Sequence, residues 1–380
     1  MDAANFPFSN VASTALKVVM RCYHTSVSRQ YDVVVVGAGV FGAWTAFHLK
    51  RAGMSVRLID RFGAGNARSS SGGESRIIRM AYGADEVYTQ ASRRSLACWK
   101  LACPDLFFET GVLSTAAPDD PYLLASRRVL KDCAIPHKLL SRTAMRKQFP
   151  QLTLATGTAG IWEPDSGVIL ARRAVQRVAA ASGADYEIAS ADADLRAPTV
   201  VYACGPWLPK LFPELLRSRI RPTRQEVFFF GAPADYKFTA TWLAWREGVY
   251  SIPALDGRGF KIAIDTHGPA FDPETGSREM TAAKLAIARA TLRRRFPDLA
   301  KAPLLETRVC QYENTSNGDF LIDRHPDRPN VWLVGGGSGH GFKHGPYVGE
   351  YVASQIAGSA PPEPRFSLAS KKTSRQRSVY

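Results

Sequence analysis

The chain has 380 residues, of which 45% are hydrophobic and 22% are charged. These values are typical of a globular protein and exclude a wholly disordered chain, a collagen-like repeat and a small disulfide-stapled domain. Two domains are expected, because one hydrophobic core rarely serves more than about 250–300 residues. The 49 Lys and Arg residues exceed the 34 Asp and Glu residues, and the net charge of +15 raises the question of an acidic partner.

Part of the excess positive charge lies at the two ends of the chain. We predict a flexible N-terminal extension for residues 1–30 and a disordered basic tail for residues 361–380, where prolines precede a Ser-, Lys- and Arg-rich stretch. The Ser, Thr and Arg content of residues 1–30 leaves a mitochondrial presequence as an alternative, although Asp2 counts against it.

Cysteine usage and hydropathy bear on compartment and on binding. The six cysteines include no CxxC pair and no cysteine–histidine cluster with zinc spacing. We therefore predict no metal site and a reducing, cytoplasmic compartment. The longest apolar run, residues 33–49, is interrupted by three glycines, which favours a strand, turn and helix over a membrane span.

The first predicted elements form a β-α-β unit. The β-branched run Tyr31–Val36 indicates a buried strand, and Ser55–Asp60 indicates a second one. Between them, Phe41–Ala52 has helical composition and is followed by Gly53 at the usual C-terminal cap position. A unit of about thirty residues has the length expected of a right-handed parallel crossover.

Later elements alternate less regularly. Helical patterns occupy Val87–Ala102, Pro121–Cys133, Ala171–Ala181, Ala282–Phe296 and, approximately, Pro346–Ile356. Short buried strands are predicted at Thr199–Ala203 and Val331–Val334. Strand-like runs also follow one another at Glu226–Phe230, Ala240–Trp245, Gly248–Ile252 and Gly259–Ile264. The sequence therefore predicts a mixed fold: a Rossmann-like α/β nucleotide-binding domain and an interleaved α+β domain built on an antiparallel sheet.

A glycine fingerprint links the first strand to the first helix. Gly37 permits a tight turn, Gly39 lets the backbone approach a pyrophosphate, and Gly42 allows close packing of the helix on the strand. Asp60 ends the second strand, where a carboxylate can accept hydrogen bonds from ribose hydroxyls. Nicotinamide and flavin dinucleotides share this fingerprint, so both remain open at this point.

Two further loops carry residues suited to binding. The polar loop that follows the second strand delivers Arg76 and Arg79, which a helical turn would place on one face. Two cations there suit a carboxylate or a reduced, anionic ring, whereas a solvated basic loop is the alternative. Near the C-terminus, Gly337, Gly339 and Gly341 form a second glycine-rich loop before a helix.

Several motifs together suggest a known family. They are the fingerprint, GESRIIR at Gly73–Arg79, WEPDSGV at Trp162–Val168, Lys261 in GFKIAI, CQY at Cys310–Tyr312, and GSGHGFK at Gly337–Lys343. From about Tyr31 to Gly358, the chain resembles the monomeric sarcosine oxidase family of FAD-dependent amine oxidases, in the D-amino-acid-oxidase-like superfamily.

The resemblance implies FAD as the cofactor and gives the first domain its function. It implies a covalent thioether between Cys310 and the flavin ring; a buried core thiol is the alternative for this residue. We assign residues 31–110, 150–224 and 305–360 to the FAD-binding domain, and residues 111–149 and 225–304 to the substrate domain. The remaining residues expected to bind FAD are Gly37, Gly39, Gly42, Asp60, Arg61, Gly337, Gly339, Gly341 and Lys343.

The resemblance also implies roles around the substrate. Lys261 is expected to lie over the flavin and to promote its reaction with oxygen, and Arg76 to lie near the ring. Arg79 and Lys343 are expected to bind the substrate carboxylate, beside a pocket lined by two aromatic residues, Tyr250 and Tyr312. Catalytic roles are thus expected for Lys261, Arg76 and Asp265. At Asp265, as at Gly72, the family's well-known oxidase has a histidine.

These residues lead to one predicted function and two alternatives. The predicted function is oxidation of a secondary or N-methyl amino acid, of sarcosine or pipecolate type, by a monomer that transfers hydride to flavin and reduces O2 to H2O2. One alternative is an FAD-dependent dehydrogenase with another electron acceptor. The other is a catalytically degenerate, basic binding protein on the same fold. No nucleic-acid partner is predicted, because no RNA-binding motif accompanies the basic residues.

Overall fold

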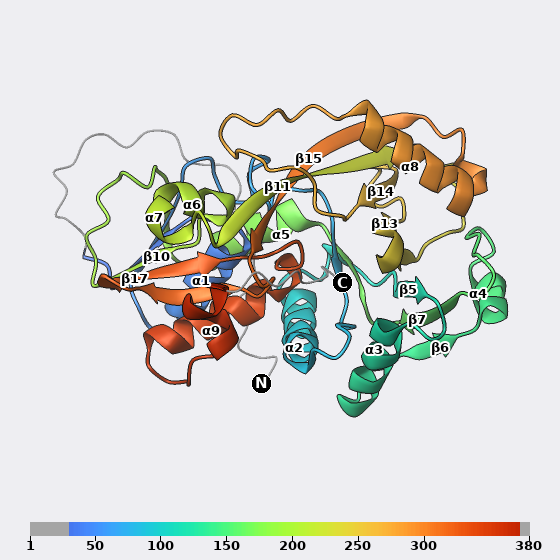
Figure 1. Ribbon diagram of the computed structural model, residues 1–380. Helices are drawn as coiled ribbons and strands as arrows, with labels where there is room; N and C mark the ends of the chain where they lie inside the picture. The colour runs from blue at the N-terminus through green and yellow to red at the C-terminus, as the bar shows by residue number, and fades with distance from the viewer. Residues whose placement is uncertain (1–29, 373–380) are drawn as a thin grey trace.

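The computed structural model describes residues 30–372 (Figure 1). The predicted N-terminal extension, and with it the presequence alternative, lies outside the described residues except for Gln30. Within the described part of the chain, no helix is long and apolar enough to cross a membrane.

The first sheet has six strands in the order β16-β17-β10-β1-β2-β9. Neighbouring strands are parallel except for the antiparallel pair β16 and β17. The run Val33–Val36 is buried along its length because alternate residues enter two different cores, one on each face of the sheet. The strands are β1 (Val33–Val36), β2 (Val56–Asp60), β9 (Asp185–Ile188), β10 (Thr199–Tyr202), β16 (Leu321–His325) and β17 (Arg328–Gly335).

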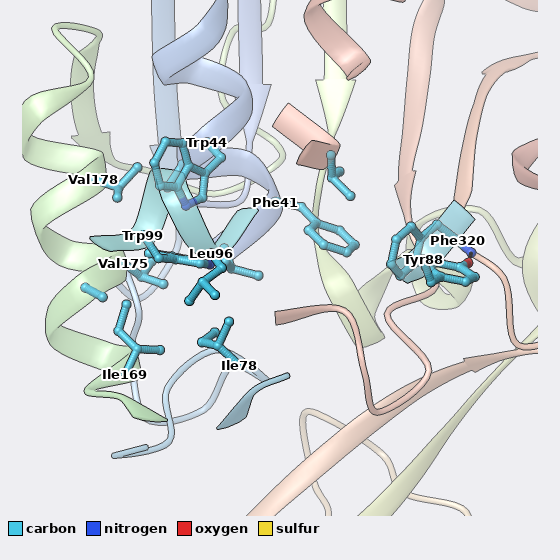
Figure 2. Close-up of a cluster of buried hydrophobic side chains, with 14 of the residues drawn as sticks. Phe41, Trp44, Ile78, Tyr88, Leu96, Trp99, Ile169, Val175, Val178 and Phe320 are labelled. Carbon is cyan, nitrogen blue, oxygen red and sulfur yellow. Dashed lines mark hydrogen bonds between the residues drawn. The ribbon is translucent and has the colours of Figure 1, made fainter. Parts of the chain in front are cut away.

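Helices cover this sheet and bury its apolar faces. Figure 2 shows Trp44 of α1 near Trp99 of α2 and Val178 of α5, and the two tryptophan rings meet edge to face at 5.1 Å. The helices of the sheet's domain are α1 (Val40–Arg51), α2 (Glu86–Ala102), α5 (Ala171–Ala181), α6 (Leu208–Leu211), α7 (Pro213–Leu216) and α9 (Gly345–Ile356). The predicted Rossmann-like α/β arrangement is therefore confirmed.

The second sheet has eight strands in the order β15-β11-β14-β13-β12-β5-β7-β6. It is antiparallel, as predicted, except for the parallel pair β12 and β5. Its helices are α3 (Pro121–Asp132), α4 (Arg142–Gln148) and the basic helix α8 (Ala282–Arg295), whose Arg294 and Arg295 both pair with Glu247. The strands are β5 (Val112–Ala116), β6 (Lys138–Leu140), β7 (Ala159–Glu163), β11 (Ile220–Phe230), β12 (Thr241–Ala244), β13 (Val249–Ile252), β14 (Phe260–Ile264) and β15 (Leu304–Thr315).

Two local predictions need correction. The segment 150–224, predicted to belong to the FAD-binding domain, includes β7. In the structure β7 pairs with β5 and β6 of the second sheet. The local sequence of a strand does not show which distant strands it will pair with. Arg76 does not start a helical turn. It begins β3 (Arg76–Ile78), which forms a small sheet with β8 (Gly167–Ile169) and β4 (Phe107–Phe108).

The long strands β11 and β15 join the two halves of the molecule (Figure 1). At one end of this pair, Ile220 packs into a core of the first sheet. At the other end, Phe228 and Phe230 enter the core of the second sheet. Cys310 lies opposite Gln225 in the middle of the ladder. The predicted flavin-linking residue is therefore held where the two halves meet.

The predicted disorder of residues 361–380 is wrong for its first part. Short 3-10 helices occupy Pro364–Phe366 and Ala369–Lys372. Phe366 is fully buried and its ring lies 5.5 Å from that of Phe320, while Arg365 forms a 2.9 Å ion pair with Asp85. One buried aromatic ring and one ion pair thus attach this segment to the half of the molecule built on the first sheet. Residues 373–380 lie outside the described part.

Candidate active site

A cavity of about 290 Å³ opens at the carboxyl ends of the parallel strands. Its wall includes Val36 at the end of β1, Asp60 at the end of β2, Ala203 just after β10 and Gly337 just after β17. Ligands of open α/β sheets bind at this edge, where connections leave the sheet on both sides.

The fingerprint glycines let the backbone come close to this cavity. Gly37 has a φ of +101°, and a Cβ added there would lie 2.5 Å from the carbonyl oxygen of Ala203. A Cβ on Gly42 would lie 1.7 Å from the carbonyl oxygen of Gly37. Gly39 lines the cavity directly before α1 begins at Val40. The positive end of a helix is thereby aimed at the cavity, as phosphate binding requires.

Asp60 and Arg61 lie at the far side of the same cavity. The carboxylate of Asp60 accepts hydrogen bonds from the backbone N–H groups of Ala38 and Phe62, both at 2.8 Å. Burial raises the pKa of Asp60, and these amides partly oppose the effect. Arg61 forms a 2.8 Å ion pair with Glu274, so its guanidinium already has a protein partner.

The second glycine-rich loop completes the wall. Gly337, Gly339 and Gly341 line the cavity, and the N–H of Gly341 donates to the carbonyl oxygen of Gly337 at 2.7 Å. Lys343, which is predicted to bind both cofactor and substrate, lines a second, smaller cavity, and its contact with the cofactor stays a prediction.

The smaller cavity measures about 90 Å³ and adjoins the first. It collects charged side chains from both halves of the chain, among them Arg79, Lys261, Asp265 and Lys343. Six residues line both cavities: Ser69, Arg76, Cys310, Tyr312, Gly339 and Phe342. The two spaces therefore meet around the Cys310 sulfur.

Lys261 extends from β14 into the smaller cavity and is only 1% exposed. Its Nζ donates to the carbonyl oxygen of Ser75 at 3.2 Å and lies 5.3 Å from the centre of the Tyr250 ring. Burial, followed by the positive charge of Arg76, lowers the pKa of Lys261 to about 7. This lysine can therefore change charge near neutral pH.

Arg79 and Lys343 converge on one tyrosine. The Nζ of Lys343 donates to the Tyr82 hydroxyl at 2.8 Å, and the guanidinium of Arg79 lies 4.8 Å from the centre of the Tyr82 ring. The Arg79 guanidinium also donates to the carbonyl oxygen of Ala81. Both cations are buried, which strengthens their attraction for an anion that enters the cavity.

Arg76 and Cys310 face each other where the cavities meet. An Nη of Arg76 lies 3.3 Å from the Cys310 sulfur and 2.8 Å from the carbonyl oxygen of Ser70. Close by, the Tyr312 hydroxyl donates to the buried carboxylate of Asp265. The structure thus brings all seven expected catalytic and substrate residues, and Cys310, to one small cavity.

Comparisons with known proteins identify the family of this chain. The FAD dependent oxidoreductase family, DAO, matches residues 32–355. The chain belongs to this family. It is 31% identical over 377 residues to the monomeric sarcosine oxidase of Bacillus sp. (strain B-0618), covering 90% of this chain and 96% of that protein. It is also 26% identical to the N-methyl-L-tryptophan oxidase of Citrobacter koseri, covering 87% and 96%.

The fold is shared with solved structures as well. L-Proline dehydrogenase from P. horikoshii superposes with a TM-score of 0.77 at 20% identity, covering 89% of this chain and 97% of that one. The resemblance to monomeric sarcosine oxidases that the motifs suggested is thereby confirmed.

The cavity of this FAD-dependent oxidoreductase suits its cofactor. The fingerprint glycines and the start of α1 would hold the diphosphate, and Asp60 the ribose. One buried acceptor in the wall, Oε1 of Glu313, has no hydrogen-bond partner among the described residues. An unpaired polar atom of this kind indicates a surface shaped for a polar ligand.

Sequence reasoning missed three residues of this oxidoreductase site. Tyr82 lies three residues after Arg79, and Glu163, which faces Arg79, is inside the WEPDSGV motif. Glu313 directly follows the CQY motif. Each stands in or beside a segment already singled out. A search for polar residues flanking those motifs would therefore have found them.

Proposed function

We propose that this protein is an oxidase of a secondary or N-methyl amino acid, with O2 as the electron acceptor. One observation carries the proposal: Lys261 and the pair Arg79 and Lys343 line the same small cavity, which meets the dinucleotide cavity at Cys310. An anchor for a carboxylate and a cation for oxygen thus lie beside the place where the two cavities join. The names of the sarcosine and N-methyl-L-tryptophan oxidases support this substrate class.

Arg79 and Lys343 would hold the substrate carboxylate through charge-assisted hydrogen bonds. Tyr82 fixes the Lys343 ammonium at 2.8 Å and stacks against Arg79, so both cations are positioned before the substrate arrives. FAD, when bound, supplies the acceptor for a hydride equivalent and returns two electrons to O2, giving H2O2 and an imine that water hydrolyses. The protein's task is to hold the amine carbon toward the junction of the cavities.

Lys261 would act in the oxygen half of the reaction. Its ammonium is buried, so little water screens its charge. Negative charge that develops as oxygen is reduced would be stabilised by a fixed cation of this kind. The negative charge of Asp265 raises the pKa of Lys261 and so favours the protonated, cationic form that would act on oxygen.

We further propose that Cys310 carries FAD through a thioether and that the enzyme is a monomer. The position of Cys310 in the wall of both cavities supports the covalent link. Acid denaturation of the purified protein tests it: yellow colour should stay with the precipitated chain and be lost from it in the Cys310→Ser variant. Free flavin in the supernatant of the wild type would contradict the link.

An amine panel with a peroxide readout tests the activity. The panel contains sarcosine, N-methyltryptophan, pipecolate, proline and glycated amino acids, and we expect peroxide with at least one secondary amino acid. Flavin bleaching by an amine without peroxide under air would identify a dehydrogenase instead. No bleaching with any member would contradict the proposed function altogether.

A further inference from the structure

Glu313 stands apart from the other residues of the dinucleotide cavity. It lies on β15 three residues beyond Cys310 and is 6% exposed. Its carboxyl group sits between the ends of two parallel strands: a Cβ on Gly335, at the end of β17, would be 2.3 Å from Oε1, and one on Gly205, just after β10, 3.8 Å from Oε2. An acidic side chain is therefore buried at the sheet edge where the cofactor binds.

The surroundings of Glu313 disfavour its ionised form. Burial raises the pKa of Glu313 to about 7, and the backbone amides of Gly336 and Gly337 oppose this shift only in part. The thiol of Cys204, just after β10, faces the Glu313 carboxyl group. Burial raises the pKa of this thiol, and the negative charges of Asp60 and Glu313 raise it further. Within the described residues, no Lys, Arg or His forms a hydrogen bond with the Glu313 carboxyl group.

The position of Glu313 also fixes which part of FAD it can meet. The diphosphate is expected at the start of α1, and the flavin ring at Cys310, where the two cavities join. Glu313 lines the same cavity, beside the ends of β10 and β17. In FAD the ribityl chain joins the flavin ring to the diphosphate, so we expect Glu313 to face this part of the cofactor. An ionised carboxylate there would add a third negative charge beside the two of the diphosphate. The cations in the cavity wall already have protein partners: Arg61 and Lys210 pair with Glu274 and Asp272, and Arg76 donates to the carbonyl oxygens of Ser70 and Ser75.

We propose that Glu313 binds FAD as a neutral carboxylic acid and donates its proton to an oxygen of the ribityl–diphosphate chain. FAD binding then requires a proton on Glu313, taken from solvent whenever the free protein has lost it. This proposal concerns cofactor binding and does not depend on which amine is oxidised.

Reversible binding is measured on the full-length apoprotein carrying Cys310→Ser, which removes any thioether. Titration with FAD is followed by flavin fluorescence at pH 6, 7 and 8. With a pKa of about 7, about a tenth of Glu313 remains neutral at pH 8, so the Kd for FAD should be about tenfold higher at pH 8 than at pH 6. Calorimetry at pH 8 in two buffers of different ionisation enthalpy should show uptake of nearly one proton per FAD.

The Glu313→Gln variant separates this role from simple packing. Its amide donates at every pH, so its Kd should be unchanged between pH 6 and 8 and lower than that of the parent at pH 8. Glu274→Gln is the matched control, because Glu274 lines the same cavity but is partly exposed and paired with Arg61. This control should keep the tenfold change.

The proposal is overturned if the parent Kd changes less than about twofold across this range, or if Glu313→Gln keeps the parent's pH dependence. Should that variant fail to fold, absence of proton uptake by the parent overturns it as well. Riboflavin, which lacks the diphosphate, serves to locate the acceptor: a retained pH dependence identifies a ribityl hydroxyl, and a lost one a phosphate oxygen. No turnover is measured, so an inactive enzyme would leave the result intact.

Discussion

The two cavities that meet at Cys310 are built in different ways. The larger one opens at the edge of one parallel sheet, where glycines in two short loops bring the backbone into its wall. The smaller one is formed by charged side chains from segments far apart in the chain: Arg79 follows β3, Lys261 lies on β14 and Lys343 precedes α9. The expected diphosphate site is thus largely local, whereas the expected flavin, amine and oxygen sites exist only when both halves of the molecule are assembled.

The substitution with the largest expected effect tests whether a glycine is needed where the backbone shapes the larger cavity. Gly37→Ala places a Cβ 2.5 Å from the Ala203 carbonyl at a φ of +101°, which requires the backbone of the turn to shift. We expect FAD affinity to fall at least about 100-fold, seen as loss of flavin absorbance from the purified protein. Gly53→Ala is the control, since φ is +85° there but nothing lies within 4 Å of the added atom. Equal flavin loss in both variants would contradict a specific role for Gly37.

Lys261→Met tests the oxygen role of the smaller cavity. We expect reoxidation of reduced enzyme by O2 to slow about 100-fold or more, with flavin reduction by the amine changed far less. In the wild type, the rate of reoxidation should fall as the pH rises above about 7, because Lys261 then loses its proton, and the variant should lack this fall. Stopped-flow measurement of both half-reactions decides; equal slowing of the two would remove the role given to Lys261.

Lys343→Met tests the carboxylate anchor. Loss of one charge-assisted hydrogen bond, worth about 1.5–3 kcal/mol, should lower kcat/KM for an amino acid about 10- to 100-fold, mostly through KM. An amine of similar size without a carboxylate provides the control, and its kcat/KM should change little. An equal loss for both compounds would show that Lys343 acts on something other than the carboxylate.

Asp265→Asn should slow reoxidation less than Lys261→Met does, and it should shift the pH dependence of reoxidation to lower pH. The Asp265 carboxylate raises the pKa of Lys261 against the larger, opposite effect of burial. Removing this charge should lower the pKa of Lys261, so the midpoint of the pH dependence of reoxidation should fall below pH 7 and reoxidation at pH 7 should slow a few-fold. Reoxidation rates measured from pH 5 to 9 test this; a midpoint that stays in place or rises would contradict the coupling.

Stability of the apoprotein should depend on pH in opposite ways for the two cavities. The pKa of Glu313 is raised from 4.5 to about 7, so the folded state binds more protons and the free energy of unfolding falls as pH rises between these values. The pKa of Lys261 is lowered from 10.5 to about 7, so unfolding becomes more costly from pH 7 to 10.5. At about 1.4 kcal/mol per pKa unit, the full change is expected to be about 3 kcal/mol for Glu313 and about 5 kcal/mol for Lys261.

Denaturant unfolding across this pH range provides the measurement. Glu313→Gln should reduce the pH dependence of the free energy of unfolding only between pH 4.5 and 7, and Lys261→Met only between pH 7 and 10.5. A variant that reduces it in the other range, or in both, would show that the two cavities do not titrate independently.

The sequence predicted the six longest helices and seven of the strands to within a few residues, because these helix and strand patterns are local; it did not predict β3 to β9, β15 or β16, and it gave only the second half of β11. It also located the cofactor half of the site: the spacing of Gly37, Gly39 and Gly42 between a strand and a helix dictates a turn that phosphate can approach. Where prediction depended on distant partners it was wrong. β7 joined another sheet through its pairing with β5 and β6, and the segment 361–372 is ordered because Phe366 finds a buried site.

By itself, then, the sequence determined an FAD-dependent oxidoreductase fold and the family motifs that mark its site. Only the tertiary structure decided how those motifs act together. It placed Tyr82 between Arg79 and Lys343, residues more than 250 positions apart in the chain, and it buried Lys261 and Glu313. The physical reason is that the pKa of a side chain depends on desolvation and on neighbouring charges, and both are set by residues that only folding brings together.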